Sequence, residues 1–461
     1  MESLSLELVA NVAESLPCPN DLMSLRLVSR RYADIAAPFL FKTLRLAGPQ
    51  QDDHVYTDGR TNGSRYLGWK KPVEFGCLHT AIDEILGVSI ARHVQTITFD
   101  PAYYREGFWE DYLVYVQEQL EEPIDEADLD YDSDGSDASD DDYERAMRRA
   151  QEERQTRLER ELPAINEARA IWDTKMAQQA VNEKSVVEAL TKLFESMCVL
   201  EKIEIMPWEF HAIMGLDLWS GFQFDNLRDE ASPSVYFLRI ISRALKSANK
   251  RLKYLSVSEV VPEHLLDDEA TRHIFTGLQH LRLAIPKVGM MLEDAPISST
   301  FIQLFRCTAP TLQRLEIIGG SKWPQLPERG SHSLMKILCN GNEETPLLFP
   351  NLEFLRLGSY ILSTSALIKF IAAQPKLMKL HFDHIYLATP ELGWPSVALA
   401  LPANVRAWEV TGNNGHFPMN DSGPLVAYNW HQSWKPSQTP LPTKYGWRML
   451  LGENGTSFIR V

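Results

Sequence analysis

The sequence predicts an α/β protein in which an N-terminal helical module is followed by an irregular arc of repeated strand–helix units. Three observations predict this fold class. Apolar residues at helical spacing fill roughly the first forty positions, a six-residue apolar pattern returns nine times along the chain, and one long acidic segment interrupts it. The chain has 461 residues, of which 44% are hydrophobic, and is therefore long enough to bury a large core.

Leucine and valine recur at every fourth residue at the start of the chain. These positions are Leu4, Leu8, Val12 and Leu16. They would lie along one face of a short helix that the prolines at positions 17 and 19 end. A second helix carries Leu22, Leu25 and Val28 on a matching face. Helices this short cannot bury a core alone, so their surplus apolar residues predict a partner.

This stretch resembles an F-box, the helical module that docks a Skp-type adaptor within cullin-based ubiquitin ligases. The matching residues are Leu4, Glu7, Leu8, Val12, Leu16, Asp21, Leu22, Leu25, Arg26, Leu27, Val28, Ser29, Arg30, Arg31 and Tyr32, followed by residues 36–41, which are similar to fungal members. The resemblance covers roughly a tenth of the chain. One departure is Ser5, which stands where the family usually has Pro. A serine can cap the helix that the proline would otherwise begin.

The resemblance implies which residues hold the adaptor. They are Leu4, Leu8, Val12, Leu16, Leu22, Leu25 and Val28. The alternative is an ordinary helical hairpin that packs on its own domain.

The pattern that returns nine times places apolar residues at the first, fourth and sixth of six positions. It begins at Phe41, Val94, Leu200, Leu252, Leu278, Leu312, Leu352, Leu377 and Val405. The last two apolar positions flank a polar one, so each unit predicts a short strand with one face inward. Amphipathic stretches predict returning helices at residues 78–91, 185–197, 236–247, 297–307, 333–339 and 363–372.

Units from Leu252 onward lie roughly 25 to 40 residues apart, the interval of a solenoid with one strand and one helix per turn. Stacked units would form a parallel sheet whose concave surface carries the polar positions between the leucines. Pro310, Pro350 and Pro375 each precede the first leucine of a unit by two residues, where proline ends a helix. The pattern resembles the irregular leucine-rich repeats of F-box proteins, although their closing Asn or Cys is absent.

An insertion of roughly a hundred residues separates the second unit from the third. Residues 125–142 are nearly all acidic, Ser or Gly, and a run that repels itself predicts disorder. A charged helix over 143–162 and a second helix over 165–181 are expected to follow. The predicted domains are 1–46, the helical module; 47–124, the first units; 125–182, the acidic insertion and charged helix; 183–412, the remaining units; and 413–461, an aromatic and proline-rich cap.

Composition argues against several classes of protein. The net charge of −16 argues against a nucleic-acid surface, which needs clustered Lys and Arg. No apolar run approaches the roughly 20 residues that span a bilayer, so no membrane partner is expected. The five widely spaced cysteines lack paired metal spacing and suit a reducing compartment, the cytoplasm or the nucleus.

No chemical site is expected, and neither a cofactor nor a metal. The pair Gly319-Gly320 stands alone and predicts a turn rather than a phosphate-binding loop. His381, Asp383 and His384 come closest to a metal cluster, but on a strand His384 would lie opposite the other two.

The resemblance therefore implies a non-catalytic substrate receptor that binds a Skp-type adaptor, and through it a cullin, with the head and an unknown protein substrate with the arc. The alternative is a leucine-rich-repeat scaffold that acts outside a ubiquitin ligase. Candidate substrate-binding residues on the concave surface are Lys253, Tyr254, His280, Arg282, Arg314, Glu316, Arg356 and His381. The three arginines recur at similar places in their units and would suit a phosphate or an acidic segment.

Overall fold

The structure of this chain is a computed structural model. It describes residues 6–16, 19–47, 73–88, 90–104, 106–121, 140–206, 233–258, 260, 265–286, 299–320, 333–341, 344–387, 394–411, 415–416, 447–452 and 455–460. Leu4, the acidic residues 125–139 and most of the predicted cap lie outside these residues. The described part combines helices with a large, mainly parallel sheet, so the predicted α/β class is confirmed.

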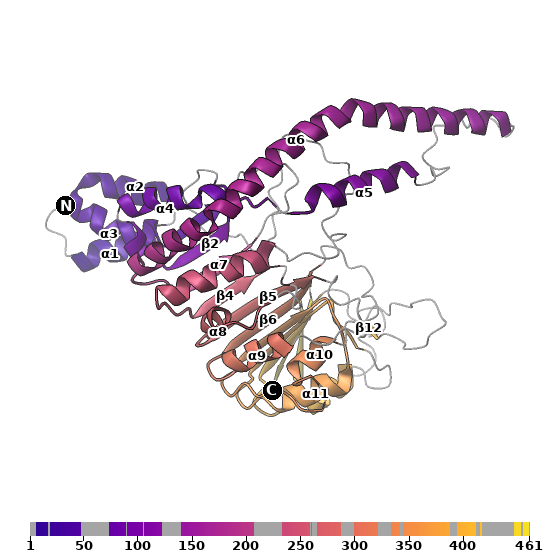
Figure 1. The fold of residues 1–461 in the computed structure, drawn as a ribbon. Helices are drawn as coiled ribbons and strands as arrows, with labels where there is room; N and C mark the ends of the chain where they lie inside the picture. Colours follow the sequence, from indigo (N-terminus) through magenta and orange to yellow (C-terminus); the bar gives the residue numbers. More distant parts are fainter. Residues whose placement is uncertain are drawn as a thin grey trace.

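Three short helices form the head at one end of the molecule (Figure 1). They are α1 (Leu6–Ser15), α2 (Pro19–Val28) and α3 (Arg30–Leu40). The head has a small core of its own, made by Ala13, Leu22, Ala36 and Leu40. Helix α3 begins after Ser29, whose hydroxyl accepts a hydrogen bond of 3.2 Å from the backbone N–H of Tyr32.

In the described part of the chain nine parallel strands follow, and each begins at the third position of one of the nine predicted units. They are β1 (Thr43–Ala47), β2 (Thr96–Asp100), β3 (Lys202–Ile205), β4 (Tyr254–Val257), β5 (His280–Pro286), β6 (Arg314–Gly320), β7 (Phe354–Gly358), β9 (Lys379–Asp383) and β11 (Ala407–Thr411). Neighbours in this order pair in register, so the fourth position of every unit, from Leu44 to Trp408, lies in one row across the sheet. The nine predicted strands are therefore confirmed.

The helices that connect the strands cover one face of the sheet (Figure 1). The helical segments after the head are η1 (Phe75–Cys77), α4 (Leu78–Gly87), η2 (Ala91–His93), α5 (Phe108–Glu121), α6 (Asp140–Ser196), α7 (Pro233–Ser247), α8 (Glu269–Phe275), α9 (Ser299–Thr308), α10 (Ser333–Leu338), α11 (Thr364–Ala372) and α12 (Trp394–Ala400). The inward leucines of the strands and the apolar faces of these segments, except α5, form one continuous core. Five of the six predicted returning helices are confirmed as α4, α7, α9, α10 and α11, and the sixth, over 185–197, is the C-terminal part of α6, whereas α5, α8 and α12 were not predicted.

A second, smaller sheet extends three of the units. It consists of β8 (Ile361–Leu362), β10 (Tyr386–Leu387) and β12 (Gly415–His416), which pair in parallel. The chain reaches β8 and β10 through Ser359 and His384, whose φ angles of 62° and 50° are left-handed. At the end of the large sheet, β14 (Gly455–Arg460) pairs antiparallel with β11 and with β13 (Trp447–Gly452), and thereby covers the edge of β11.

Helix α6 differs from the prediction. The sequence predicts separate helices over 143–162, 165–181 and 185–197, but the structure has a single helix of 57 residues, about 85 Å long. Pro163 lies inside it, and the helix bends in its middle (Figure 1). A proline removes one backbone hydrogen bond and displaces a carbonyl, which bends an exposed helix without ending it. The C-terminal part of α6 packs on the sheet through residues such as Leu190 and Phe194, while its N-terminal part projects away.

Candidate functional site

The face of the sheet that the connecting helices leave uncovered carries the polar side chains of the strands. Side chains alternate between the two faces of a strand, so the fifth position of each unit lies opposite the buried leucines. Pairing of the strands aligns these positions in one line, which we call the polar row. It consists of Arg45, Thr98, Glu204, Ser256, Arg282, Glu316, Arg356, His381 and Glu409.

A second line on the same face is formed by the third position of each unit and carries cations beside aromatic rings. The Lys202 ammonium lies 4.3 Å from the ring centre of Tyr254, and the rings of Tyr254 and His280 meet edge to face with 5.8 Å between their centres. The Arg314 guanidinium lies 4.0 Å from the ring centre of Phe354. Each cation is attracted by the electron-rich face of the ring, which fixes the position of the charge.

The centre of the face is a cluster of opposite charges around Glu316. This carboxylate is 7% exposed and lies 2.7 Å from the Arg314 Nε atom and 3.7 Å from the Arg356 Nη1 atom. Arg356 also donates a hydrogen bond of 3.1 Å to Asp383. A chain of ion pairs, two of which are charge-assisted hydrogen bonds, therefore holds the side chains of β6, β7 and β9 in fixed positions.

Arg282 differs from the charged side chains of this cluster because its charge is not paired by a described residue. It is half-buried between Ser256 and Glu316 in the polar row, yet within the described part of the chain its guanidinium has no ion pair or hydrogen bond. Its five N–H donors are therefore available to an acidic or phosphorylated group.

Seven of the eight predicted substrate-binding residues lie on the open face of the sheet. Tyr254, His280 and Arg314 lie in the line of third positions, while Arg282, Glu316, Arg356 and His381 lie in the polar row. Lys253 precedes β4, and its ammonium group forms an ion pair of 2.5 Å with Glu201. Sequence reasoning missed Lys202, Glu204, Phe354, Asp383 and Glu409, which also line this face or its edge. They occupy positions on the same face of the strands as the predicted residues, and this repeated placement within the units could have identified them.

The predicted adaptor-binding residues divide into two groups in the head. Leu8, Val12 and Val28 are 53%, 50% and 54% exposed. Leu22 is only 4% exposed and belongs to the core of the head, against which Leu16 and Leu25 pack. The assignment of Leu22 to a partner surface is therefore corrected, because its side chain already has neighbours within the head.

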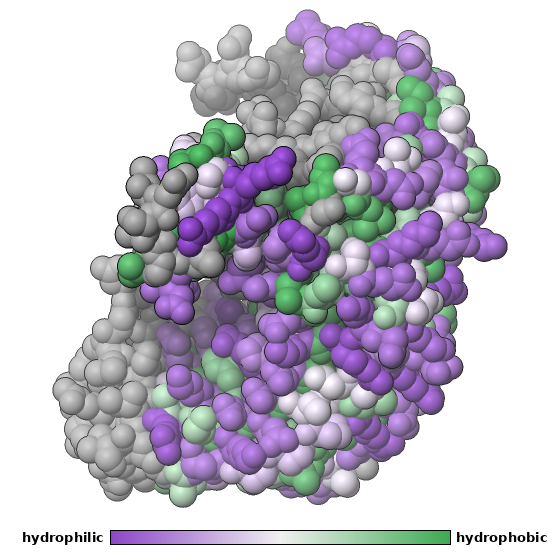
Figure 2. Space-filling view, turned by 90° about the vertical axis from the view of Figure 1, so that its left-hand side faces the viewer, coloured by the Kyte–Doolittle hydropathy of each residue, from purple (hydrophilic) through white to green (hydrophobic). Residues whose placement is uncertain are grey.

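Two other apolar side chains in the described part of the head are exposed. Leu27 is 86% exposed, and Met23 is exposed as well. Hydrophobic residues are interspersed with hydrophilic ones on the side of the molecule where the head lies (Figure 2). In α1 the residues that face the interior are Val9 and Ala13, each one position after Leu8 and Val12.

The two histidines of the open face are harder to protonate than free imidazoles. Burial lowers the pKa of His280 below 6.5, and the positive charges of Arg314 and Lys202 lower it further. The carboxylate of Glu316 acts in the opposite direction. Burial and the Arg356 charge lower the pKa of His381 in the same way, against the opposing carboxylates of Glu409, Asp383 and Glu316.

We expect His381 to make the fold sensitive to acid. The unfolded chain binds a proton near pH 6.5, whereas the folded chain binds it only at lower pH, so the free energy of unfolding falls as the pH drops through this window. The His381→Gln variant should lose less stability than the parent chain between roughly pH 7.5 and 5.5. Urea titrations at the two pH values measure this, and titrations at roughly pH 8.5 are the control. An equal loss in both proteins would contradict the expectation.

No protein-family model matches this sequence, and no curated protein is significantly similar to it. Among the described residues, no three His, Cys, Asp or Glu side chains are grouped as they would be to hold a metal ion. Within the same part of the chain, no helix combines the length and the apolar character needed to cross a membrane.

Proposed function

We propose that this chain is the substrate-recognition subunit of a Skp–cullin–F-box ubiquitin ligase, acting in the cytoplasm or the nucleus. The head, as an F-box, binds a Skp-type adaptor and through it the cullin. The arc, as an irregular leucine-rich-repeat solenoid, binds a protein substrate. The observation that carries the proposal is the exposed apolar surface of the head.

The exposed apolar side chains are Leu8 and Val12 on α1 and Met23, Leu27 and Val28 on α2. Side chains of this kind each gain on the order of 1.5–3 kcal/mol when they are fully removed from water, so their exposure on three short helices favours a protein partner. The head does not need them for its own core, which it builds from Ala13, Leu22, Ala36 and Leu40. The proposal is supported further by the match of α1 and α2 to the residues typical of the F-box.

The mechanism is proximity. The receptor forms no covalent bond itself. By holding a substrate and the charged conjugating enzyme in one complex, it raises the local concentration of a substrate lysine near the ubiquitin thioester. The open face of the sheet supports the proposed binding of a substrate, because its cations and carboxylates are fixed by ion pairs and Arg282 remains available.

The test is adaptor binding by a double variant, Leu8→Asp with Val12→Asp. We expect the full-length variant to lose co-purification with Skp-type adaptor and cullin, because two carboxylates cannot be buried in an apolar interface without a large cost. Both positions are exposed, so the head should keep its fold. The matched control is Asn11→Asp with Ser15→Asp, which adds the same charge at exposed polar positions of the same helix.

Adaptor binding by the Leu8/Val12 variant at the level of the control would contradict the assigned interface. If the unmodified chain brings down neither adaptor nor cullin, the alternative is favoured, a leucine-rich-repeat scaffold whose head covers the first strand of the sheet.

A further inference from the structure

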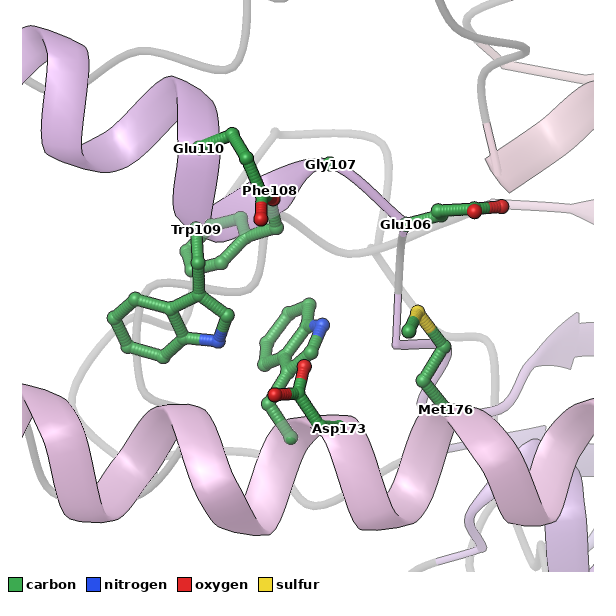
Figure 3. A pocket seen from close by; sticks show the side chains of 8 residues that line it. Glu106, Gly107, Phe108, Trp109, Glu110, Asp173 and Met176 are labelled. Carbon is green, nitrogen blue, oxygen red and sulfur yellow. The ribbon is translucent and has the colours of Figure 1, made fainter.

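A pocket lies outside the face considered above, between the start of α5 and the middle of α6 (Figure 3). Its volume is about 320 Å³. Its lining residues are Glu106, Gly107, Phe108, Trp109, Glu110, Trp172, Asp173 and Met176. Asp173 and Met176 point from α6 toward α5, and Trp109 reaches into the space between the two helices (Figure 3).

The floor of the pocket is aromatic. Phe108 and Trp172 are stacked with 4.4 Å between ring centres, and Trp109 meets Trp172 edge to face at 6.0 Å. All three rings are almost fully buried, so the packing of α5 on α6 fixes their positions. Gln179 strengthens this arrangement, because its side chain bonds both the N–H and the C=O of Tyr104 just before α5, at 2.6 and 2.7 Å.

The rim of the pocket is acidic. It carries the carboxylates of Glu106, Glu110 and Asp173, all on exposed residues. Arg169 pairs with Glu110 at 3.0 Å, whereas Glu106 and Asp173 have no cationic partner among the described residues. The Glu106 side chain points away from Trp109 and Asp173 (Figure 3), so a cation that enters the pocket would meet the Asp173 carboxylate and the aromatic floor, and both attract positive charge.

One buried donor in the pocket has no acceptor. Trp109 is 3% exposed, and its Nε1–H group makes no hydrogen bond to any residue that the structure describes. This nitrogen points toward the space between the helices (Figure 3). Buried N–H groups are normally paired, so the pocket suits a ligand that brings a hydrogen-bond acceptor as well as a positive charge.

We propose that this pocket binds an arginine residue of a partner polypeptide, with the guanidinium at Asp173 and a peptide carbonyl accepting from the Trp109 indole. A guanidinium is planar, stacks on aromatic rings and offers several N–H donors to the Asp173 carboxylate. A lysine ammonium is a more strongly hydrated point charge and fits a flat aromatic site less well. The site uses no residue of the proposed adaptor surface or of the sheet face, and it does not depend on the proposed function.

The test is fluorine NMR of the full chain labelled with 5-fluorotryptophan, in which the Trp109→Phe variant identifies the Trp109 resonance. The probe is an acetylated, amidated Gly-Gly-Arg-Gly-Gly peptide. Its control is the same peptide with citrulline, which keeps the shape of arginine and lacks the charge. We expect the arginine peptide to shift the Trp109 resonance, and the citrulline peptide to bind about tenfold more weakly.

Isosteric variants test the rim. Asp173→Asn should weaken the arginine peptide about fivefold to tenfold, whereas Glu167→Gln, an exposed carboxylate on α6 that does not line the pocket, should leave binding unchanged. Asp173 is exposed, so the variant should fold like the parent. An unshifted Trp109 resonance, or equal binding of the arginine and citrulline peptides, would overturn the proposal. Guanidinium chloride binding as tightly as the peptide would overturn the role of the peptide carbonyl.

Discussion

The Phe382→Ala variant is expected to lose about 3–5 kcal/mol of the free energy of unfolding. Phe382 lies on the covered face of β9, is fully buried and packs against Trp394 with 5.1 Å between ring centres. Truncation to alanine removes most of that buried area and leaves a cavity that a close-packed sheet–helix core cannot fill. Urea denaturation monitored by circular dichroism measures the change.

The matched control is Phe354→Ala on the neighbouring strand β7. Phe354 carries the same side chain on the opposite face of the same sheet, where it is half-buried and meets Arg314. Its loss should cost about 1 kcal/mol or less, mostly from the cation–π contact. Similar costs for the two variants would contradict the assignment of the core to the helix-covered face.

The strands were predictable because their signal is local and repeated. In each unit the fourth and sixth residues are apolar and the fifth is usually polar, and this period of two specifies both a strand and its buried face. The same reasoning placed Arg282, Glu316, Arg356 and His381 on the opposite face, where pairing brings them into one row. The ion pairs of Arg356 with Glu316 and Asp383 were not predictable, because they depend on register between strands that lie 25 or more residues apart in the chain.

The helices of the head were also predictable, but their orientation was not. Leu8 and Val12 have the same spacing as Val9 and Ala13, and the two pairs lie on adjoining faces of one helix. The pair with the small Ala13 faces the interior of the head, where Ala13 packs with Ala36 of α3. Periodicity alone does not distinguish the face that fills a small core from the face left for a partner.

The glycine pair at residues 319 and 320 was interpreted wrongly. It ends β6 instead of forming a turn, because the two residues pair with Ile285 and Pro286 of β5. A β-carbon on Gly319 would lie 2.6 Å from the backbone oxygen of Ser359, so glycine is required there by close approach of the next unit. That neighbour is 40 residues away in the sequence and leaves no local signal.

The local sequence pattern also gives no sign of hydrogen bonds between one side chain and backbone groups far away in the chain. Gln374 is the clearest case. It follows α11, is 1% exposed and accepts a hydrogen bond of 2.9 Å from the N–H of Phe349. Its amide nitrogen donates to the carbonyls of Leu347 and Phe370, both at 2.9 Å. Gln374 thus supplies the partners that the irregular segment before β7 does not find in a strand or a helix.

The Gln374→Met variant should therefore lose about 2–4 kcal/mol of the free energy of unfolding, although methionine has nearly the same shape. The reason is that the N–H of Phe349 and the C=O of Leu347 would stay buried without partners. Hydrogen exchange at the Phe349 amide should accelerate together with the loss measured in urea. The control is Gln313→Met. The hydrogen bonds of Gln313 are made by its backbone and survive the substitution, so little change in the free energy of unfolding is expected. A Gln374→Met variant as stable as this control would show that the segment keeps its conformation without the glutamine.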